Sequence, residues 1–208
     1  MKFFVNFLSA FRICAAFAVV ATLILALENP TLTPIMFQLT FILFALGSIS
    51  DWFDGYLARK YNVCTKIGGV MDHIGDKLLV VNTMIMLAIM LPQWYIIVPI
   101  IVMTARELYI SGLREFLGTQ KIEMPVPKAR FSMGKIKTTM QMISICAFLI
   151  TPFILSLYTN TIPSINVVRA LSGLSYIAIA TLWLALVASV WSAIQYTGTF
   201  LGHLKKIK

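Results

Sequence analysis

Long apolar runs are the feature of this sequence that most limits its fold. Six mostly apolar segments are separated by short polar stretches and cover residues 3–27, 35–60, 68–91, 94–117, 132–157 and 166–200. Each is long enough to supply the roughly 20 residues that a helix needs to cross the hydrocarbon core of a bilayer. Backbone N–H and C=O groups find no water there, and helices satisfy them internally. The sequence therefore predicts an all-α integral membrane protein with six transmembrane helices.

The composition agrees with the membrane class. Of the 208 residues, 59% are hydrophobic and 12% are charged, which is too apolar for a soluble domain of this length. The three cysteines, Cys14, Cys64 and Cys146, are scattered and form no C-x-x-C pair, so neither a disulfide framework nor a zinc site is indicated. Because no internal repeat or low-complexity tract divides the chain, we expect residues 1–208 to form a single six-helix transmembrane domain.

The basic residues predict the orientation in the membrane. The loops 28–34, 92–93 and 158–165 contain no Lys or Arg, whereas the opposite loops and tails contain Lys2, Lys60, Lys66, Lys121, Lys128, Arg130, Lys205, Lys206 and Lys208. By the positive-inside rule, both termini face the cytoplasm. The net charge of +9 thus reflects topology and anionic headgroups, and we expect no nucleic-acid partner. Short loops and the lack of a transit sequence suit a multi-pass protein of a bacterial cytoplasmic membrane.

Four of the eight acidic residues lie at the end of the second apolar segment and the start of the third: Asp51, Asp54, Asp72 and Asp76. A carboxylate near a bilayer core costs roughly 2.5–3.5 kcal/mol on insertion scales. Four of them can crowd together only if protons or cations neutralise them. Hard oxygen ligands favour Mg²⁺ or Mn²⁺, which often share their coordination with substrate phosphates. The alternative is that these residues are water-exposed helix caps or ion-paired loop residues.

The spacing of these aspartates places small residues beside them. Positions i, i+3, i+4 and i+7 share one helix face, and this relation joins Asp51, Asp54, Gly55 and Ala58. A second face has the spacing i, i+4, i+8 and contains Gly68, Asp72 and Asp76. Two such faces would gather the carboxylates around a pocket floored by small residues, with Arg59 and Lys77 available for a substrate's charge. We expect this polar site at the cytoplasmic interface.

A second polar group lies on the fourth and fifth segments. Arg106 and Arg114 are eight residues apart, close to two helical turns, so both project from one flank. Arginine suits two-pronged binding of a phosphate dianion. Lys135 and Lys137 on the next segment cannot point the same way, so we expect one to enter the pocket. Anchoring at the membrane interface is the alternative for each basic residue.

The aspartate pattern, D-x-x-D-G-x-x-A-R followed eight residues later by G-x-x-x-D-x-x-x-D, resembles the signature of the CDP-alcohol phosphatidyltransferases. The runs R-E-x-x-x-S-G-L-R-E-F, from Arg106, and G-K-x-K-T-T-x-Q-M, from Gly134, are similar to the branch of that family whose acceptor is glycerol 3-phosphate. The likeness covers roughly residues 6–142. Two positions depart from it: His73 stands where the branch usually has Pro, and Gly75 where it usually has Ala.

The resemblance implies a metal-dependent enzyme that transfers the phosphatidyl group of CDP-diacylglycerol to sn-glycerol 3-phosphate. The implied metal ligands, for one or two Mg²⁺ or Mn²⁺ ions, are Asp51, Asp54, Asp72 and Asp76. Asp76 is the implied general base. The implied CDP-binding residues are Gly55, Ala58, Arg59, Gly68, Asn6 and Ser9. The implied acceptor phosphate ligands are Arg106, Arg114, Lys135 and Lys137. The family resemblance also implies a homodimer.

Other interpretations of the same residues stay open at this point. The acceptor could be inositol phosphate or phosphatidylglycerol, because branches with those acceptors share the aspartate pattern. A divalent-cation transporter could also cluster carboxylates, although acidic groups near the bilayer midplane on broken helices would then be expected. Finally, Asn6, Ser9 and Arg12, which are spaced three residues apart, could be interfacial anchors instead of residues near a nucleotide.

Overall fold

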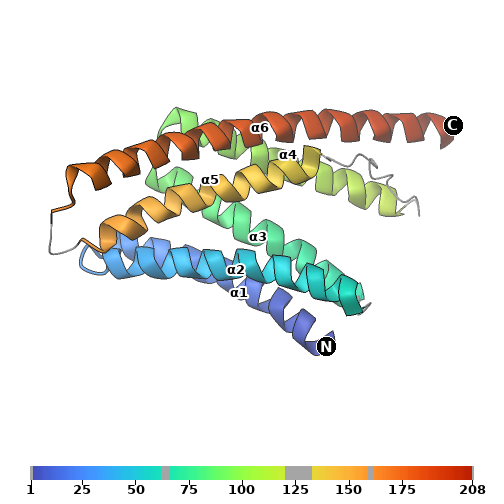
Figure 1. Cartoon of the computed structure of the whole chain (residues 1–208). Helices are drawn as coiled ribbons and strands as arrows, with labels where there is room; N and C mark the ends of the chain where they lie inside the picture. Colours follow the sequence, from blue (N-terminus) through green and yellow to red (C-terminus); the bar gives the residue numbers. More distant parts are fainter. Residues whose placement is uncertain (1, 62–65, 120–132, 159–161, 208) are drawn as a thin grey trace. The chain divides into compact units, whose positions relative to one another are not determined.

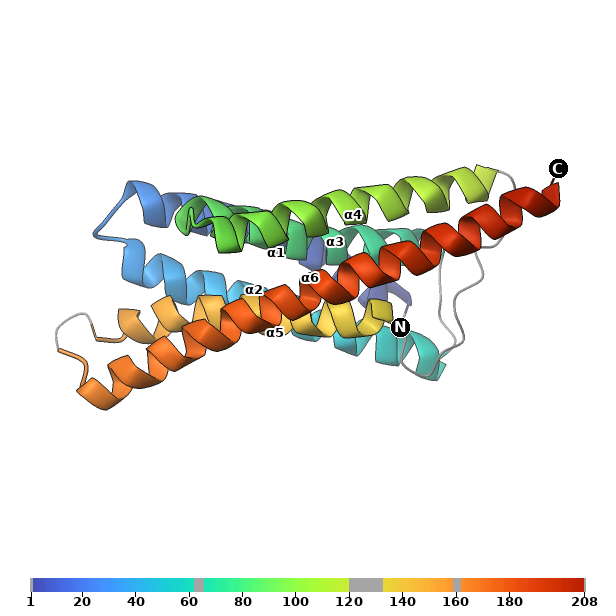
Figure 2. The ribbon, with the colours of Figure 1, turned by 90° about the horizontal axis from the view of Figure 1, so that it is seen from above.

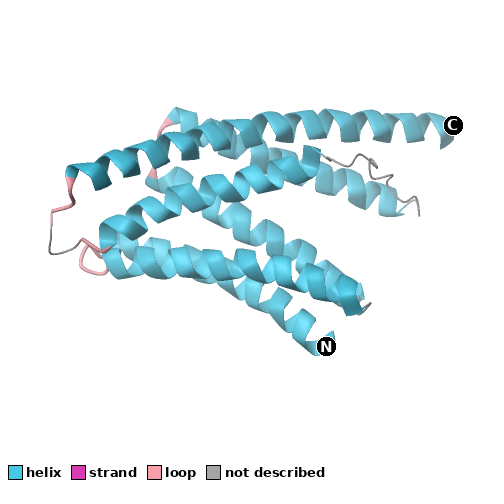
Figure 3. Ribbon diagram, in the orientation of Figure 1, coloured by secondary structure: helices cyan, strands magenta, loops and turns pink. Residues whose placement is uncertain are grey.

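The computed structural model describes the backbone of residues 2–61, 66–119, 133–158 and 162–207, and every regular element in these ranges is an α-helix (Figures 1 and 3). The six helices are α1 (Lys2–Glu28), α2 (Thr33–Tyr61), α3 (Lys66–Met90), α4 (Trp94–Thr119), α5 (Met133–Ser156) and α6 (Ile165–Ile207). Each contains a stretch long and apolar enough to cross a membrane. The predicted all-α architecture with six membrane-length helices is confirmed.

The last helix is longer than the sequence pattern predicts. We expected the sixth segment to end near residue 200, with the basic residues beyond it as a tail, but α6 has 43 residues and continues to Ile207. At 1.5 Å per residue its length is about 65 Å, roughly twice the thickness of a bilayer's hydrocarbon core. The hydropathy pattern marks where apolar residues stop, whereas the helical backbone continues because Lys205 and Lys206 are good helix formers.

The structure divides into two compact units, and the first consists of residues 1–91 and 144–178. In this unit α1 packs along both α2 and α3, while α2 and α3 touch each other over a much shorter stretch. The buried side of α1 carries Ala15, Ala16, Val19 and Leu23, each at most 2% exposed. Small residues on this side allow the helix backbones to approach closely, as is common between membrane helices.

Two further contacts fix α2 against its neighbours. The hydroxyls of Thr22 and Thr40 are 2.7 Å apart and join α1 to α2 within the apolar core. A Cβ atom at Gly47 would lie 2.7 Å from a terminal carbon of Leu79 on α3 and 3.8 Å from the Cβ of Ala15 on α1. The absence of a side chain at Gly47 therefore permits α2 to pack against both helices at once.

The chain directions in this unit bring three helix ends together. The N-terminal end of α1, the C-terminal end of α2 and the N-terminal end of α3 lie at the same end of the unit (Figures 1 and 2). These ends carry Asp51 and Asp54 on α2 and Asp72 and Asp76 on α3. The arrangement agrees with the predicted gathering of the four aspartate positions at one end of the bundle.

The second unit consists of residues 92–143 and 179–208, so it contains α4, the first part of α5 and most of α6. A ladder of contacts runs along α4 and α6 and joins residues 82 to 88 positions apart in sequence. It begins where the indole N–H of Trp183 donates to the carbonyl of Tyr95 at 3.0 Å and reaches the edge-to-face rings of Phe116 and Phe200. Because the offset is nearly constant, α4 and α6 run parallel, as alternating membrane spans require of two even-numbered helices.

Candidate active site

The structure describes the side chains of some predicted site residues and not of others. The described ones are Ser9, Asp76, Arg106, Arg114 and Lys137, and the backbone of Gly68 is buried near the start of α3. The side chains of the other predicted residues lie outside the described part of the structure, although each of these residues is helical: Asn6, Asp51, Asp54, Ala58, Arg59, Asp72, His73 and Lys135, together with the backbone surroundings of Gly55.

Asp76 is held by an arginine from another helix. Nη1 of Arg12 on α1 donates to Oδ1 of Asp76 on α3 at 2.5 Å. The Arg12 side chain is 1% exposed and the Asp76 side chain is 39% exposed. The ion pair thus fixes the carboxylate from its buried side while its other side reaches the surface. Ser9, one turn before Arg12, is also buried, so both side chains are enclosed by protein, which favours a role inside the bundle over interfacial anchoring.

Gly75 lies directly against this arginine. A Cβ atom there would be 3.5 Å from Cδ of Arg12, from a side-chain carbon of Ile13 and from the carbonyl oxygen of Ser9. These are ordinary van der Waals distances, so alanine fits at this position without moving its neighbours. The departure from the usual Ala therefore removes one methyl group from the α1–α3 contact and does not open a different kind of site.

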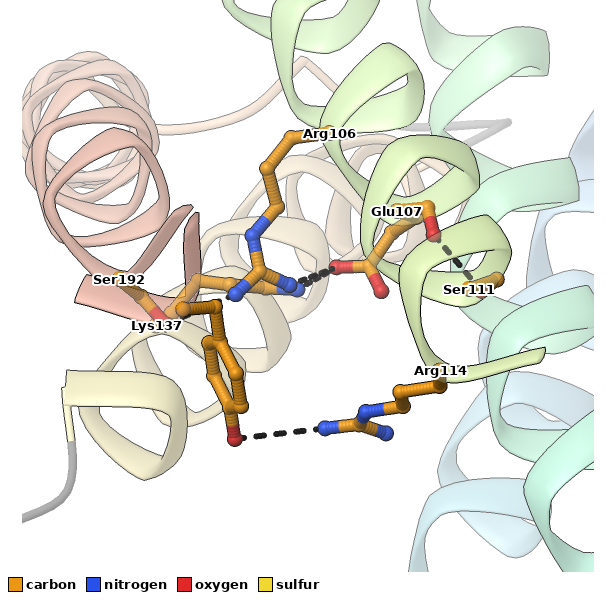
Figure 4. Close-up of polar contacts among 7 residues, drawn as sticks. Arg106, Glu107, Ser111, Arg114, Lys137 and Ser192 are labelled. Atoms are coloured by element: carbon orange, nitrogen blue, oxygen red, sulfur yellow. Dashed lines mark hydrogen bonds and ion pairs between the residues drawn. The ribbon is translucent and has the colours of Figure 1, made fainter. Parts of the chain in front are cut away.

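The second group of site residues centres on Glu107. Oε1 of Glu107 accepts from Nη1 of Arg106 at 3.2 Å and forms an ion pair with Nζ of Lys137 on α5 (Figure 4). The side chains of all three are at most 16% exposed. Since burying a charge without a partner is expensive, this carboxylate explains how two cations can lie inside a membrane-length bundle. Lys137 thus joins this cluster, and the side chain of Lys135 lies outside the described part of the structure.

Arg114 joins the same cluster through an aromatic residue of α6. Nη2 of Arg114 donates to the hydroxyl of Tyr196 at 3.3 Å. The guanidinium carbons of Arg106 and Arg114 lie 6.0 and 5.4 Å from the centre of the Tyr196 ring. The predicted shared flank of the two arginines is confirmed, because one ring contacts both. Nη2 of Arg106 also donates to the hydroxyl of Ser192 at 2.8 Å.

The cluster carries an unbalanced charge. Arg106, Arg114 and Lys137 are cations and Glu107 is the carboxylate that joins two of them, which gives these four side chains a formal net charge of +2. A phosphate monoester carries about −1.5 to −2 at pH 7. Arginine forks bind such groups with two parallel hydrogen bonds. The cluster is thus chemically suited to a phosphate dianion.

Sequence reasoning left the role of one residue that completes these groups open and missed two others. Arg12 has a detectable signal, since a charged residue inside an apolar helix needs a partner, but nothing in the sequence names Asp76 as that partner. Ser192 and Tyr196 have no signal, because serine and tyrosine are common in membrane helices. Their role follows from the parallel register of α4 and α6, which only the tertiary structure reveals.

The predicted metal ligands can be tested only in part. Among the described side chains, no group of three or more His, Cys, Asp and Glu residues forms a metal site, but three of the four predicted ligands lie outside that set. The donor chemistry nevertheless fits a hard divalent cation. The partly exposed Asp76 supplies a carboxylate, and the remaining three predicted ligands are also aspartates on the same end of α2 and α3.

Comparison with known proteins shows the family of the whole chain. The family model for the CDP-alcohol phosphatidyltransferases matches residues 3–199. The chain belongs to this family. It is 32% identical over 163 residues to a Salmonella typhimurium protein named CDP-diacylglycerol–glycerol-3-phosphate 3-phosphatidyltransferase, covering 78% of this chain and 79% of that protein. An Escherichia coli K12 protein of the same name is 32% identical over 155 residues, 74% of each chain.

Family membership confirms the resemblance on which the sequence interpretation rests. It also extends the similarity beyond the two motif regions, because the match to the family model includes most of α6. The alternative interpretation as a divalent-cation transporter is disfavoured. It expected broken helices, whereas α2 and α3 are continuous through their aspartate positions.

Substitution of Gly75 tests the packing around Arg12. We expect Gly75→Ala to keep or raise the midpoint temperature of unfolding in detergent, because alanine fits the space and favours a helix by about 1 kcal/mol relative to glycine. Gly75→Val is the matched comparison. Its extra methyl groups must displace the Arg12 stem or the Ser9 backbone, which costs about 1–3 kcal/mol and lowers the midpoint. Equal loss of stability in both variants would contradict the described packing.

Proposed function

We propose that this protein transfers the phosphatidyl group of CDP-diacylglycerol to sn-glycerol 3-phosphate, giving phosphatidylglycerophosphate and CMP. The observation that carries the choice of acceptor is the cluster of Arg106, Arg114, Lys137 and Glu107, whose net charge of +2 suits a phosphate dianion. The names of the relatives from Salmonella typhimurium and Escherichia coli support the same donor and acceptor.

Recognition of the acceptor rests on its phosphate. Arg106 and Arg114 offer planar forks of N–H donors, and Lys137 adds a third cation. The side chains of Arg106 and Lys137 are largely buried beside Glu107, whereas Arg114 is exposed. Lys135 is the fourth residue that the sequence assigns to this role. Because Glu107 offsets part of the positive charge, the cluster is stable before the acceptor arrives. A neutral acceptor such as serine would leave the remaining charge without a counterion.

Asp76 is the proposed general base. It takes the proton of the acceptor hydroxyl as that oxygen forms a bond to the phosphorus of the phosphatidyl group, and the bond from this phosphorus to the CMP oxygen breaks. The Arg12 contact supports the role because it fixes the carboxylate from the buried side. A positioned base must lie within hydrogen-bond reach of the proton that it removes.

The donor is assigned to the aspartate-bearing ends of α2 and α3. Asp51, Asp54, Asp72 and Asp76 would hold one or two Mg²⁺ or Mn²⁺ ions, which offset the negative charge of the pyrophosphate when bound. The small and basic residues there would bind the cytidine and ribose: Gly55, Ala58, Arg59, Gly68, Asn6 and Ser9. The diacyl tails would stay in the bilayer, which the membrane-length helices allow.

A panel of acceptors tests the function. Purified protein in detergent is given CDP-diacylglycerol, Mg²⁺ and one of glycerol 3-phosphate, serine, inositol phosphate or phosphatidylglycerol, and CMP release is measured. We expect turnover with glycerol 3-phosphate alone. Turnover only with serine or phosphatidylglycerol would contradict our assignment of Arg106, Arg114 and Lys137 to a phosphate monoester. Turnover only with inositol phosphate would contradict the choice of glycerol 3-phosphate and keep that assignment.

Asp76→Asn tests the base in the same assay. The asparagine side-chain oxygen can still accept from Arg12, but the buried arginine loses a counterion. We therefore expect a folded variant with a lower midpoint temperature of unfolding and a kcat that falls by at least about 100-fold, the usual contribution of a general base. The midpoint temperature of unfolding controls for misfolding. A well-folded variant with nearly full turnover would show that another group removes the proton.

Removal of divalent ions tests the metal assignment. We expect EDTA to abolish CMP release and added Mg²⁺ or Mn²⁺ to restore it, because the crowded carboxylates need a cation before they can approach a pyrophosphate. Asp51→Asn should raise the metal concentration needed for half-maximal turnover. Turnover that EDTA leaves unchanged would remove the metal from the proposal.

The proposal places both termini and the active site on the cytoplasmic side of the cell membrane. Its support is the distribution of Lys and Arg among the loops and tails. Sealed inside-out vesicles should then use externally added glycerol 3-phosphate without detergent, whereas sealed right-side-out vesicles should need permeabilisation. The opposite pattern would reverse the orientation. A homodimer, expected from the family resemblance, belongs to the same proposal and can be tested by cross-linking in native membranes.

A further inference from the structure

The face of α6 that contacts α4 carries two polar residues one helical turn apart, Ser192 and Tyr196. They are 1% and 8% exposed, and positions i and i+4 share one helix face. Each side-chain hydroxyl accepts a hydrogen bond from a different arginine of the cationic cluster: Ser192 from Arg106 and Tyr196 from Arg114. A buried serine on a membrane helix can bond to a carbonyl of its own helix, as Ser50 does, so the bond between Ser192 and Arg106 is informative.

Tyr196 offsets the electrostatic repulsion between the two arginines of the cluster. Arg106 and Arg114 repel each other when no anion lies between them. The Tyr196 ring lies within about 6 Å of both guanidinium groups, the range in which an aromatic face attracts a cation. A single ring therefore stabilises two like charges in the absence of substrate and sets the spacing between them.

The contacts orient the arginines without using up their donors. A guanidinium has five N–H groups. Arg106 uses one for Glu107 and one for Ser192, and its buried Nε finds no hydrogen-bond partner among the described residues. Arg114 uses one for Tyr196. N–H donors of the two arginines thus remain for an anion. Because folding has already restricted these side chains, binding of the anion costs less conformational entropy.

We propose that Ser192 and Tyr196 are positioning residues, which hold Arg106 and Arg114 in the arrangement that binds the phosphate of the acceptor. The inference rests on the proposed function and adds α6 to its acceptor site. It predicts a specific kinetic signature. Loss of either residue should weaken binding of glycerol 3-phosphate, and the KM for CDP-diacylglycerol should stay unchanged because the donor is assigned to the ends of α2 and α3.

Graded substitutions test the proposal with purified protein in detergent. Tyr196→Phe keeps the ring and loses the hydroxyl contact, so we expect the KM for glycerol 3-phosphate to rise by about threefold. Tyr196→Leu also removes the aromatic face, and the rise should reach about 10- to 30-fold, the range that one or two lost cation–π contacts imply. Ser192→Ala should raise this KM by about threefold to tenfold through the lost bond to Arg106.

The same helix offers matched controls. Tyr176 is 75% exposed, and the exposed Ser172 bonds only locally, to the carbonyl of Arg169. Tyr176→Leu and Ser172→Ala should leave both KM values unchanged. Inorganic phosphate, tested as a competitor of glycerol 3-phosphate, should inhibit the Tyr196 variants more weakly than the wild type and in proportion to their KM.

The possible outcomes separate this inference from the function on which it rests. A wild type with no turnover of glycerol 3-phosphate would overturn both. Normal wild-type turnover with an unchanged acceptor KM in Tyr196→Leu would overturn only the positioning role. An equal rise in the KM for both substrates, or a fall in kcat alone, would also overturn it, because general structural damage gives that pattern. If Tyr196→Leu does not fold, Tyr196→Phe and Ser192→Ala decide by the same criteria.

Discussion

The structure depends on one constraint: a charged side chain buried in a membrane-length helix must be matched by an oppositely charged group. Arg12 meets this requirement through Asp76 and thereby joins α1 to α3. Glu107 meets it for Arg106 on its own helix and for Lys137 on α5. Removing one partner of such a pair is costly because the other charge stays buried. The pairs therefore hold helices together and place reactive groups at the same time.

The two groups differ in a way that suits their proposed roles. The Arg12 and Asp76 pair is charge-balanced and leaves the carboxylate partly exposed, which suits a group that must meet a hydroxyl or a cation. The cluster around Glu107 has an excess of positive charge, with Arg106 and Lys137 largely buried and Arg114 exposed at its edge, which suits a group that binds an anion. Burial of Arg12, Arg106 and Lys137 strengthens their electrostatic interactions relative to water.

The last helix has a larger part in this arrangement than its sequence indicates. It carries no acidic residue, and its membrane-length portion reads as an ordinary apolar span. Its parallel packing on α4 nevertheless brings Ser192 and Tyr196 to the two arginines. A helix without chemistry of its own can thus decide how the charged residues of its neighbour are spaced.

The sequence by itself determined the class of fold, because the bilayer allows only helices of a certain length and apolar character. It also determined which residues share a helix face, since the helical period is fixed: Arg106 and Arg114 project together, and Lys137 and Lys135 do not. The family resemblance added the activity, which the match over residues 3–199 supports. The tertiary structure alone decided which faces meet. Asp76 pairs with a residue 64 positions away and Arg106 with one 86 positions away, and no local pattern encodes such a register, because it follows from the packing of whole helices against one another.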